Sequence, residues 1–278
     1  MRKPFLGLLA LASLPLAPLA GCAAVDRDAN ADSLARPAGM SRMLMKTDPF
    51  TLTAFVRITD RSRPVTIYVE GDGLAWLSRT EVSRDPTPRD ALGLALAAAD
   101  PSANVVYLAR PCQFTNRDRN PTCAPAYWTA KRFAPEVIAA MNQAVDQVAA
   151  QVPGQQVNLV GYSGGGAVAV LVAARRQDVA SIRTVAGNLD HVQVNRVNGV
   201  SPLAGSLNAI DVAAQVAKIP QIHFSGSLDR TVPPAIANRF VQATGGTCAQ
   251  ALTLQGADHE NGWPARWREL LAMAPGCG

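Results

Sequence analysis

Charged and aromatic residues are scarce in this sequence, at 17% and 5% of its 278 positions. It also lacks internal repeats and low-complexity blocks, which excludes a repeat protein and a disordered chain. Apolar residues make up 48% of the positions, enough for one sizeable core. The length therefore suits a single α/β domain.

The sequence lacks the patterns that bind metal ions and nucleic acids. There is no Cys-x-x-Cys pair, and the three histidines do not have the spacing of metal ligands. We therefore expect no metal, and no organic cofactor either. Lysine and arginine form no stripe, and the net charge is only +5, so we expect no nucleic-acid partner.

No apolar run is long enough for a membrane-spanning helix. The longest, Phe5 to Ala20, is short and is interrupted by Pro15 and Pro18. Because Arg2 and Lys3 precede it, the pattern predicts a secretory signal. Loss of residues 1–21 would leave 24 basic and 21 acidic residues, a net charge of +3.

The end of this signal, Leu19-Ala20-Gly21-Cys22, resembles the bacterial lipobox. The resemblance implies cleavage before Cys22 and attachment of lipid to this cysteine. Ordinary signal cleavage beside a coincidental cysteine is the alternative. We expect a protein anchored by lipid to a membrane of the cell envelope, facing the periplasm or the exterior. Residues 22–48 are polar and alanine-rich, and are predicted to be a flexible tether to a domain at 49–278.

Four cysteines remain after Cys22, and an exported protein allows disulfides. Cys112 and Cys123 bracket a polar loop, whereas Cys248 and Cys277 lie at the two ends of the last structural unit. Three pairings are open. We favour Cys112–Cys123 with Cys248–Cys277, because each then closes a local loop.

Strand-like and helix-like runs alternate after residue 50. The predicted strands are short and apolar, and cover 51–58, 65–69, 104–108, 157–160, 182–186, 221–225 and 251–254. The predicted helices cover 87–99, 133–152, 164–176, 208–217, 233–244 and 264–273. This alternation predicts an α/β fold with a mostly parallel sheet and helices on both faces.

Residues 161–165, Gly-Tyr-Ser-Gly-Gly, form a G-x-S-x-G motif between a predicted strand and a predicted helix. A sharp turn at this place exposes the hydroxyl of Ser163, and small neighbours relieve its strained backbone. The amide of Gly164 is then free to bind an oxyanion. A glycine-rich turn with a serine cap is the alternative.

In this setting the motif resembles the nucleophile turn of the α/β-hydrolase superfamily, over about residue 50 to the C-terminus. The family places its acid and its histidine on later loops, in that order. The resemblance implies that His259, which follows the last strand, is the base. His223 lies within an apolar strand and is expected to be packed, and His191 follows a strand end, where it could line the pocket.

The acid implied by the resemblance is Asp229. Gly226, Asp229, Val232 and Pro233 match a Gly-x-x-Asp-x-x-Val-Pro element that the family often carries at this point. Its role would be to orient the imidazole and stabilise the imidazolium. Asp190, after the preceding strand, is the second candidate, and a helix-cap role for Asp229 is the third interpretation.

Residues 70–73, Glu-Gly-Asp-Gly, follow the strand at 65–69, where many family members have His-Gly. The resemblance implies that the amide of Asp72 or Gly73 is the second oxyanion donor beside Gly164. A plain glycine turn is the alternative. Trp76 and Leu77 are expected either to line an acyl pocket or to be core.

These residues predict a serine hydrolase that cleaves small-molecule esters, esterase- or lipase-like, through an acyl-enzyme. A peptidase or an acyltransferase would use the same three residues, and a non-catalytic binding lipoprotein is the third hypothesis. Residues 110–131 and 189–207 are expected to border the entrance. There is no large inserted cap segment, so nothing in the sequence limits substrate size.

Overall fold

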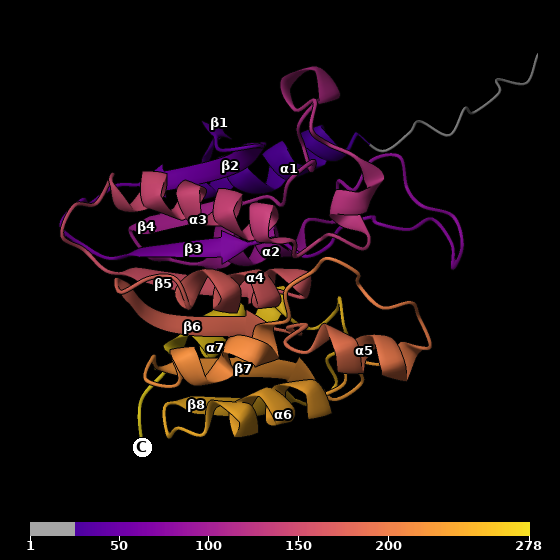
Figure 1. The fold of residues 1–278 in the computed structure, drawn as a ribbon. Coiled ribbons are helices and arrows are strands. Elements are labelled where there is room, and N and C mark those ends of the chain that lie inside the picture. The colour runs from indigo at the N-terminus through magenta and orange to yellow at the C-terminus, as the bar shows by residue number, and fades with distance from the viewer. Residues whose placement is uncertain (1–25) are drawn as a thin grey trace, which may run out of the picture.

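The centre of the molecule is one eight-stranded β-sheet with the strand order β1-β2-β4-β3-β5-β6-β7-β8 (Figure 1). The computed structural model describes residues 26–278, so the predicted signal peptide and the predicted lipidation of Cys22 lie outside the described residues. The strands are β1 (Ser41–Lys46), β2 (Thr51–Ile58), β3 (Val65–Val69), β4 (Asn104–Leu108), β5 (Val157–Tyr162), β6 (Val179–Val185), β7 (Gln221–Gly226) and β8 (Ala249–Leu254).

The sheet is mostly parallel, as predicted. Strands β4, β3, β5, β6, β7 and β8 pair in parallel, and β1 and β2 pair antiparallel at one edge. The loops that follow the parallel strands therefore meet at one edge of the sheet, where open α/β sheets bind their ligands.

Helices cover both faces of the sheet (Figure 1). One face carries α3 (Pro135–Ala149), α4 (Gly164–Ala173), a 3₁₀ helix (Ala209–Val216) and α6 (Ala235–Thr244), which share one apolar core with the sheet. The other face carries α1 (Arg27–Ala35), α2 (Leu92–Ala99) and α7 (Trp267–Ala272) around a second core. Helix α5 (His191–Asn198) follows β6 at the edge where the parallel strands end.

The central elements are apolar because they are covered on all sides. Every residue of β3 and of α4 is buried. Strands buried on both faces carry continuous apolar runs, which is why the sequence predicts β3 and β4 with their observed bounds. Helix α3 is amphipathic, with one buried stripe and one polar face.

The prediction of a tether extending to residue 48 is wrong for the described part of that range. Helix α1 begins directly after Asp26, whose carboxylate caps it by accepting from Ala29 N at 3.0 Å. Strand β1 pairs with β2, and Arg42 joins α1 to β1 through Asp28 and Asp32. The fold therefore begins by residue 26, four residues after Cys22.

The structure confirms both favoured disulfides, Cys112–Cys123 and Cys248–Cys277. The first closes a loop between β4 and α3, and the second joins the start of β8 to the C-terminal segment. Within residues 26–278, no helix combines the length and the apolar composition that a membrane crossing requires.

Candidate active site

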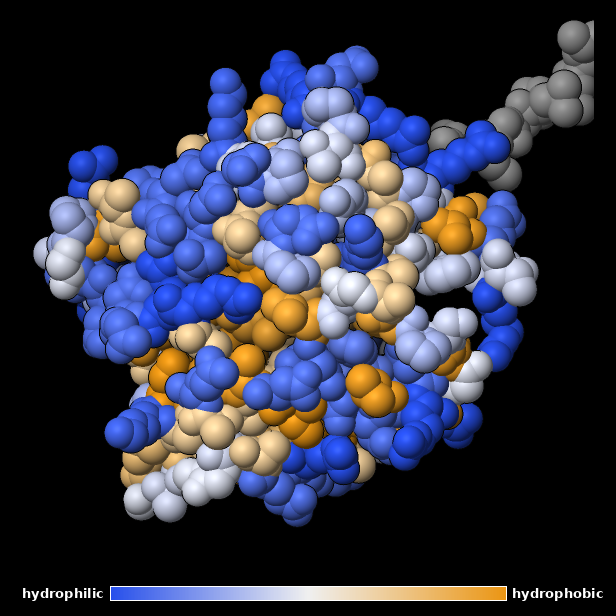
Figure 2. Space-filling model, viewed as in Figure 1, coloured by the Kyte–Doolittle hydropathy of each residue, from blue (hydrophilic) through white to orange (hydrophobic). Residues whose placement is uncertain are grey.

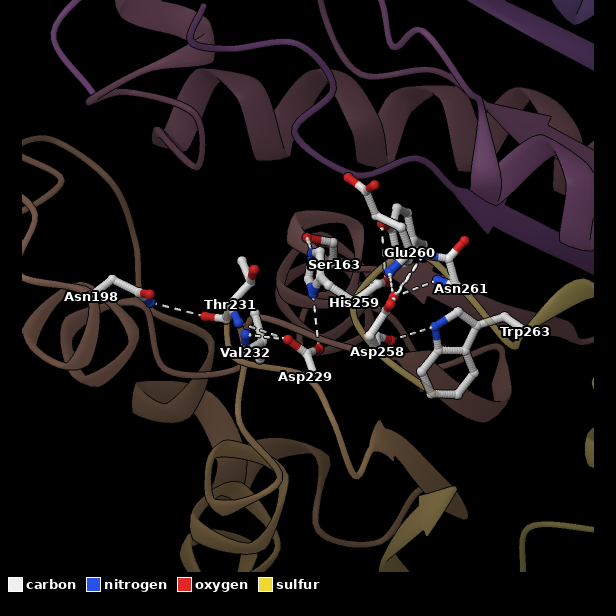
Figure 3. Close-up of polar contacts among 11 residues, drawn as sticks. Ser163, Asn198, Asp229, Thr231, Val232, Asp258, His259, Glu260, Asn261 and Trp263 are labelled. Carbon is white, nitrogen blue, oxygen red and sulfur yellow. Dashed lines mark hydrogen bonds and ion pairs between the residues drawn. The ribbon is translucent and has the colours of Figure 1, made fainter. Parts of the chain in front are cut away.

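Three side chains from separate loops meet at the edge where the parallel strands end. Ser163 follows β5, Asp229 follows β7 and His259 follows β8. The Oγ atom of Ser163 lies 2.9 Å from His259 Nε2, and His259 Nδ1 lies 2.9 Å from Asp229 Oδ2 (Figure 3). The structure thus brings the three predicted residues into one hydrogen-bonded line.

Ser163 has the strained backbone expected of a sharp strand-to-helix turn, with φ 50° and ψ −119°. Its neighbours must be small. A Cβ atom at Gly161 would lie 2.2 Å from Gly165 O, and one at Gly165 would lie 2.2 Å from Val69 O. Three backbone bonds hold the turn: Ser163 N donates to Val185 O, and Ser163 O accepts from Asn188 N and Gly166 N. The spacing of the motif therefore follows from close backbone packing.

Hydrogen bonds around Asp229 fix the tautomer of His259. Asp229 is fully buried, and its Oδ1 accepts from the amides of Thr231 and Val232, each at 2.8 Å. Its Oδ2 is left to accept from Nδ1 of His259. Because Nδ1 carries the proton, Nε2 has a free lone pair directed at the hydroxyl of Ser163. The imidazole is therefore arranged to take a proton from this serine.

The loop that carries His259 is held from both sides. Oδ1 of Asp258 accepts from the amides of Glu260 and Asn261, and Trp263 donates through Nε1 to Asp258 O (Figure 3). The bonds to Asn261 and Glu260 hold the pKa of Asp258 below its usual value. On the other side the Tyr162 ring lies beside the imidazole, with ring centroids 5.6 Å apart.

Residues 70–73 lie against the nucleophile turn. A Cβ atom at Gly71 would lie 3.3 Å from Ser163 Cβ, and one at Gly164 would lie 2.0 Å from Asp72 Oδ1. The amide of Gly71 is already bonded to Glu70 Oε1 at 2.8 Å. The amides of Asp72 and Gly73 remain the candidates for the second oxyanion donor, as predicted, beside that of Gly164.

Glu70, which replaces the histidine of many family members, is buried beneath this loop. Its Oε1 accepts from Gly71 N and from Gly93 N in the first turn of α2, and its Oε2 accepts from the hydroxyl of Tyr107 at 3.0 Å. Burial raises the pKa of Glu70, and these donors offset part of that rise. Its side chain therefore fixes residues 70–73 to α2.

A largely buried ion cluster holds the other side of the same loop. The carboxylate of Asp72 binds Arg132 at 2.5 Å and Arg110 at 3.3 Å. Burial acts to raise the pKa of Asp72, but the two guanidinium groups outweigh it and hold the pKa below its usual value. Burial also lowers the pKa of Arg110 to about 10. The sequence carries no local signal for this cluster, because Asp72 lies between β3 and α2 whereas Arg110 and Arg132 lie at the two ends of the segment between β4 and α3.

We expect Asp72→Asn to lower kcat about tenfold, because the loop at 70–73, which carries two candidate oxyanion amides, loses its ionic support. It should also destabilise the fold by about 2 kcal/mol, since buried Arg110 and partly buried Arg132 lose their counterion. Urea unfolding and steady-state kinetics would measure both. The matched control is Asp85→Asn, which breaks the exposed Arg27–Asp85 pair and should cost less than about 1 kcal/mol. If the two substitutions changed kcat and stability equally, the supporting role assigned to Asp72 would be contradicted.

A cavity of about 790 Å³ opens at the nucleophile. Ser163, His259, Asp72 and Arg132 lie in its wall. Its apolar lining comes from the loop after β3, from the start of α2 and from α1, and comprises Leu34, Leu74, Ala75, Trp76, Pro88, Ala91, Leu92 and Ala95. Trp76 thus lines the pocket, and both Trp76 and Leu77 are exposed, so a core role for these two residues is wrong.

The other candidate residues, Asp190 and His191, do not join the hydrogen-bonded series of Ser163, His259 and Asp229. Asp190 caps α5 and binds Arg239 and Asn208, so it is not the partner of His259. His191 is buried and its ring stacks on Phe133, and it is absent from the wall of the cavity, contrary to one expectation.

His223 is packed in the core, as predicted. Its Nδ1 accepts from the hydroxyl of Thr184 at 2.9 Å, and its Nε2 donates to Gln221 Oε1 at 3.2 Å. Burial lowers the pKa of His223 to about 3, so it stays neutral at ordinary pH. Both ring nitrogens are therefore satisfied without a role at the site.

The Cys112–Cys123 disulfide lies beside the site. Gln113, next to Cys112, donates through Nε2 to Gly71 O at 3.0 Å and so holds the loop at 70–73. We expect Cys112→Ser with Cys123→Ser to destabilise the fold by about 3 kcal/mol and also to lower kcat. The control is Cys248→Ser with Cys277→Ser, which should cost a similar free energy and leave kcat unchanged. Equal loss of kcat in both pairs would contradict the link to the loop.

No protein-family model and no curated protein sequence matches the chain. Many solved structures do. A putative α/β hydrolase from Agrobacterium tumefaciens is 14% identical, with a TM-score of 0.55 over 84% of this chain and 92% of that one. The chain has the α/β-hydrolase fold. A bacterial membrane phospholipase A is 13% identical, with a TM-score of 0.59 over 88% of this chain and 89% of that one.

Puromycin hydrolase has the same fold, with 15% identity and a TM-score of 0.60 over 83% of this chain. The chain spans only 37% of the length of puromycin hydrolase. At these identities the likeness concerns the fold, and the chemistry rests on the arrangement of the side chains.

Proposed function

We propose that the protein is a serine hydrolase that cleaves carboxylic esters through an acyl-enzyme. The observation that carries this proposal is the line from Asp229 through His259 to Ser163, with both contacts at 2.9 Å. A buried carboxylate, an oriented imidazole and a hydroxyl on a strained turn together form an activated nucleophile.

In the first half of the reaction, His259 Nε2 takes the proton of Ser163 while Oγ attacks the carbonyl carbon. The carbonyl oxygen becomes an oxyanion and accepts from the amide of Gly164 and from that of Asp72 or Gly73. Asp229 stabilises the imidazolium. When the carbon–oxygen bond to the leaving alcohol breaks, His259 returns the proton to that alcohol and the acyl group stays on Ser163.

In the second half, His259 removes a proton from water as the water attacks the acyl carbon. The tetrahedral intermediate collapses, the carboxylic acid leaves, and Ser163 regains its proton from the imidazolium. Ester and water are the two reactants that these steps consume.

The lining of the cavity supports an ester with an apolar acyl part. Part of the cavity wall, from the loop after β3 and the start of α2, carries aliphatic side chains and Trp76, which suit an apolar acyl group. Polar side chains, among them Arg89, Asp90 and Glu260, line other parts of the wall. A bacterial membrane phospholipase A has the same fold over nearly the whole length of both chains.

A panel of substrates tests the reaction type. Purified protein would be offered p-nitrophenyl esters of increasing chain length, the matching anilides, and peptides. We expect ester turnover that rises from short to medium chains, with anilides at least about 100-fold slower. Faster cleavage of peptides would favour a peptidase. If an added alcohol captured most of the acyl group in place of water, the protein would be an acyltransferase.

We also propose that a lipid on Cys22 holds this domain at a membrane of the cell envelope. The lipobox-like segment supports the proposal. Metabolic labelling with an alkyne fatty acid would test it: we expect label on the full chain and none on Cys22→Ala.

A further inference from the structure

Exposed apolar side chains are concentrated at the edge of the sheet that holds the active site. Among the described residues, the six most exposed large apolar side chains are Leu228, Val192, Val197, Val200, Leu77 and Trp76, from 61% down to 42% exposed. All six lie in segments that follow β3, β6 or β7, at the ends of these parallel strands. Scattered exposed apolar residues are ordinary, but confinement of the most exposed ones to one edge is not.

These residues form two rims beside the cavity. The first rim is Trp76 and Leu77, and Trp76 is part of the cavity wall. The second rim is Val192, Val197 and Val200 on and after α5 with Leu228 after β7. Figure 1 shows α5 and the segment after β3 on the side of the molecule to which β3 points, and Figure 2 shows apolar side chains among hydrophilic ones there.

The two parts of the second rim are joined. Asn198, at the end of α5, donates to Thr231 O at 2.9 Å, and Thr231 lies in the cavity wall three residues after Leu228 (Figure 3). The second rim is therefore linked to the cavity wall through Thr231, and the first rim is part of that wall through Trp76.

Charge near the rims suits an anionic surface. Arg196 and Arg230 are exposed, and along the chain they lie next to Val197 and two residues after Leu228. No acidic residue occurs between positions 191 and 210, and Asp229 is buried in the triad. Residues 79–85 after the first rim carry Arg79, Glu81, Arg84 and Asp85, which balance to no net charge, so the positive charge lies at the second rim. Apolar side chains interleaved with arginine bind the interface of anionic lipid bilayers.

The start of the described chain lies at the same cavity. Asn30 and Leu34 of α1 belong to its wall, and Arg27 donates to Thr87 O and pairs with Asp85 in the loop before α2. The chain from Cys22 to Asp26 advances four residues, a reach of at most about 14 Å. A lipid on Cys22 would therefore hold this face, and no distant one, close to a membrane.

We propose that the two rims dock on the surface of an anionic lipid bilayer, so that the cavity takes ester substrate directly from the lipid phase. The substrate part of this statement rests on the proposed ester hydrolysis, whereas the docking part does not. Trp76 makes the docking measurable, because the other three tryptophans, Trp128, Trp263 and Trp267, are buried.

The test uses the full chain carrying Ser163→Ala, so that no lipid is consumed. It is mixed with vesicles of phosphatidylglycerol or phosphatidylcholine whose acyl chains are brominated, and tryptophan emission is recorded with and without Trp76→Phe. We expect bromine to quench the Trp76 component, more strongly in phosphatidylglycerol. If the protein sediments with vesicles while Trp76 stays unquenched, an anchor alone binds it and the proposal is overturned. A concentration-dependent shift of Trp76 emission without vesicles would overturn it in favour of a second copy of the chain.

Matched variants of the active enzyme separate docking from chemistry. Val197→Glu on the second rim should slow hydrolysis of an ester held in vesicles by about tenfold, because it loses apolar contact and adds a negative charge. It should leave hydrolysis of a short water-soluble ester unchanged. The control Leu252→Glu, on the edge strand β8 at 37% exposure, should change neither. Equal slowing by both variants would overturn the docking proposal. If bromine quenched Trp76 but the wild-type protein hydrolysed no ester, the proposed ester hydrolysis would be refuted and the docking proposal would stand.

Discussion

Replacing Ser163 with alanine is expected to lower kcat by roughly 10⁵- to 10⁶-fold, with little change in stability. The substitution removes the one oxygen that both accepts the acyl group and bonds His259 Nε2. It leaves the backbone of the turn in place, since Ser163 is bonded through its N and O atoms. The measurement is ester hydrolysis at saturating substrate, with unfolding in urea recorded in parallel.

The matched control for this result is Ser227→Ala, in the loop after β7. Its hydroxyl accepts from Gly256 N and contacts none of the three aligned residues. We expect its kcat to stay within about twofold of the wild type. Residual turnover of Ser163→Ala at a tenth of the wild-type rate would show that another group is the nucleophile.

The second large effect is expected from Asp229→Asn, which should lower kcat by about 10⁴-fold. The amide oxygen of the substituted side chain can still accept from Thr231 and Val232, so the loop should keep its shape. Its NH₂ group would face His259 Nδ1 as a donor. The imidazole must then carry its proton on Nε2 and can no longer accept from Ser163. We therefore expect kcat to fall while the protein stays folded.

Asp190→Asn is the control for Asp229→Asn, because Asp190 is the other acid that chain order allows. In the structure it binds Arg239 and Asn208 at the start of α5. We expect some loss of stability and a kcat within about threefold of the wild type. If Asp190→Asn lowered kcat more than Asp229→Asn did, Asp190 and not Asp229 would be the acid that acts on His259.

Much of the sheet could be predicted from the sequence. Strands β2, β3 and β4 have the predicted bounds, because runs of β-branched and aromatic residues end at clear turn signals. Helix α1 and strand β1 were not predicted, since only two small residues of α1 are buried, Ala31 and Ala35, and β1 is an edge strand. The predicted helix start at Thr87 is also wrong: its hydroxyl accepts from Phe114 N, and α2 begins at Leu92.

The residues of the active site likewise include some that could be predicted from the sequence and some that could not. Ser163 could be predicted from a local motif, and Asp229 and His259 from the resemblance of their segments and their order to the α/β-hydrolase superfamily. The supporting roles of Glu70, Arg110, Arg132 and Gln113 could not be predicted, because each joins the loop at 70–73 to a distant segment through contacts that only the fold creates. Arg110, for example, is 38 residues from its partner Asp72.

Covalent labelling of the folded protein by a fluorophosphonate, followed by mass spectrometry of the peptides, decides whether Ser163 is an activated nucleophile. The structure places an oriented imidazole 2.9 Å from the hydroxyl of Ser163, and such a hydroxyl attacks phosphorus. We expect one adduct, on Ser163, that is absent in Ser163→Ala and strongly slowed in His259→Ala. A properly folded wild-type protein that stays unlabelled, or an adduct on any other residue, would contradict the proposed chemistry.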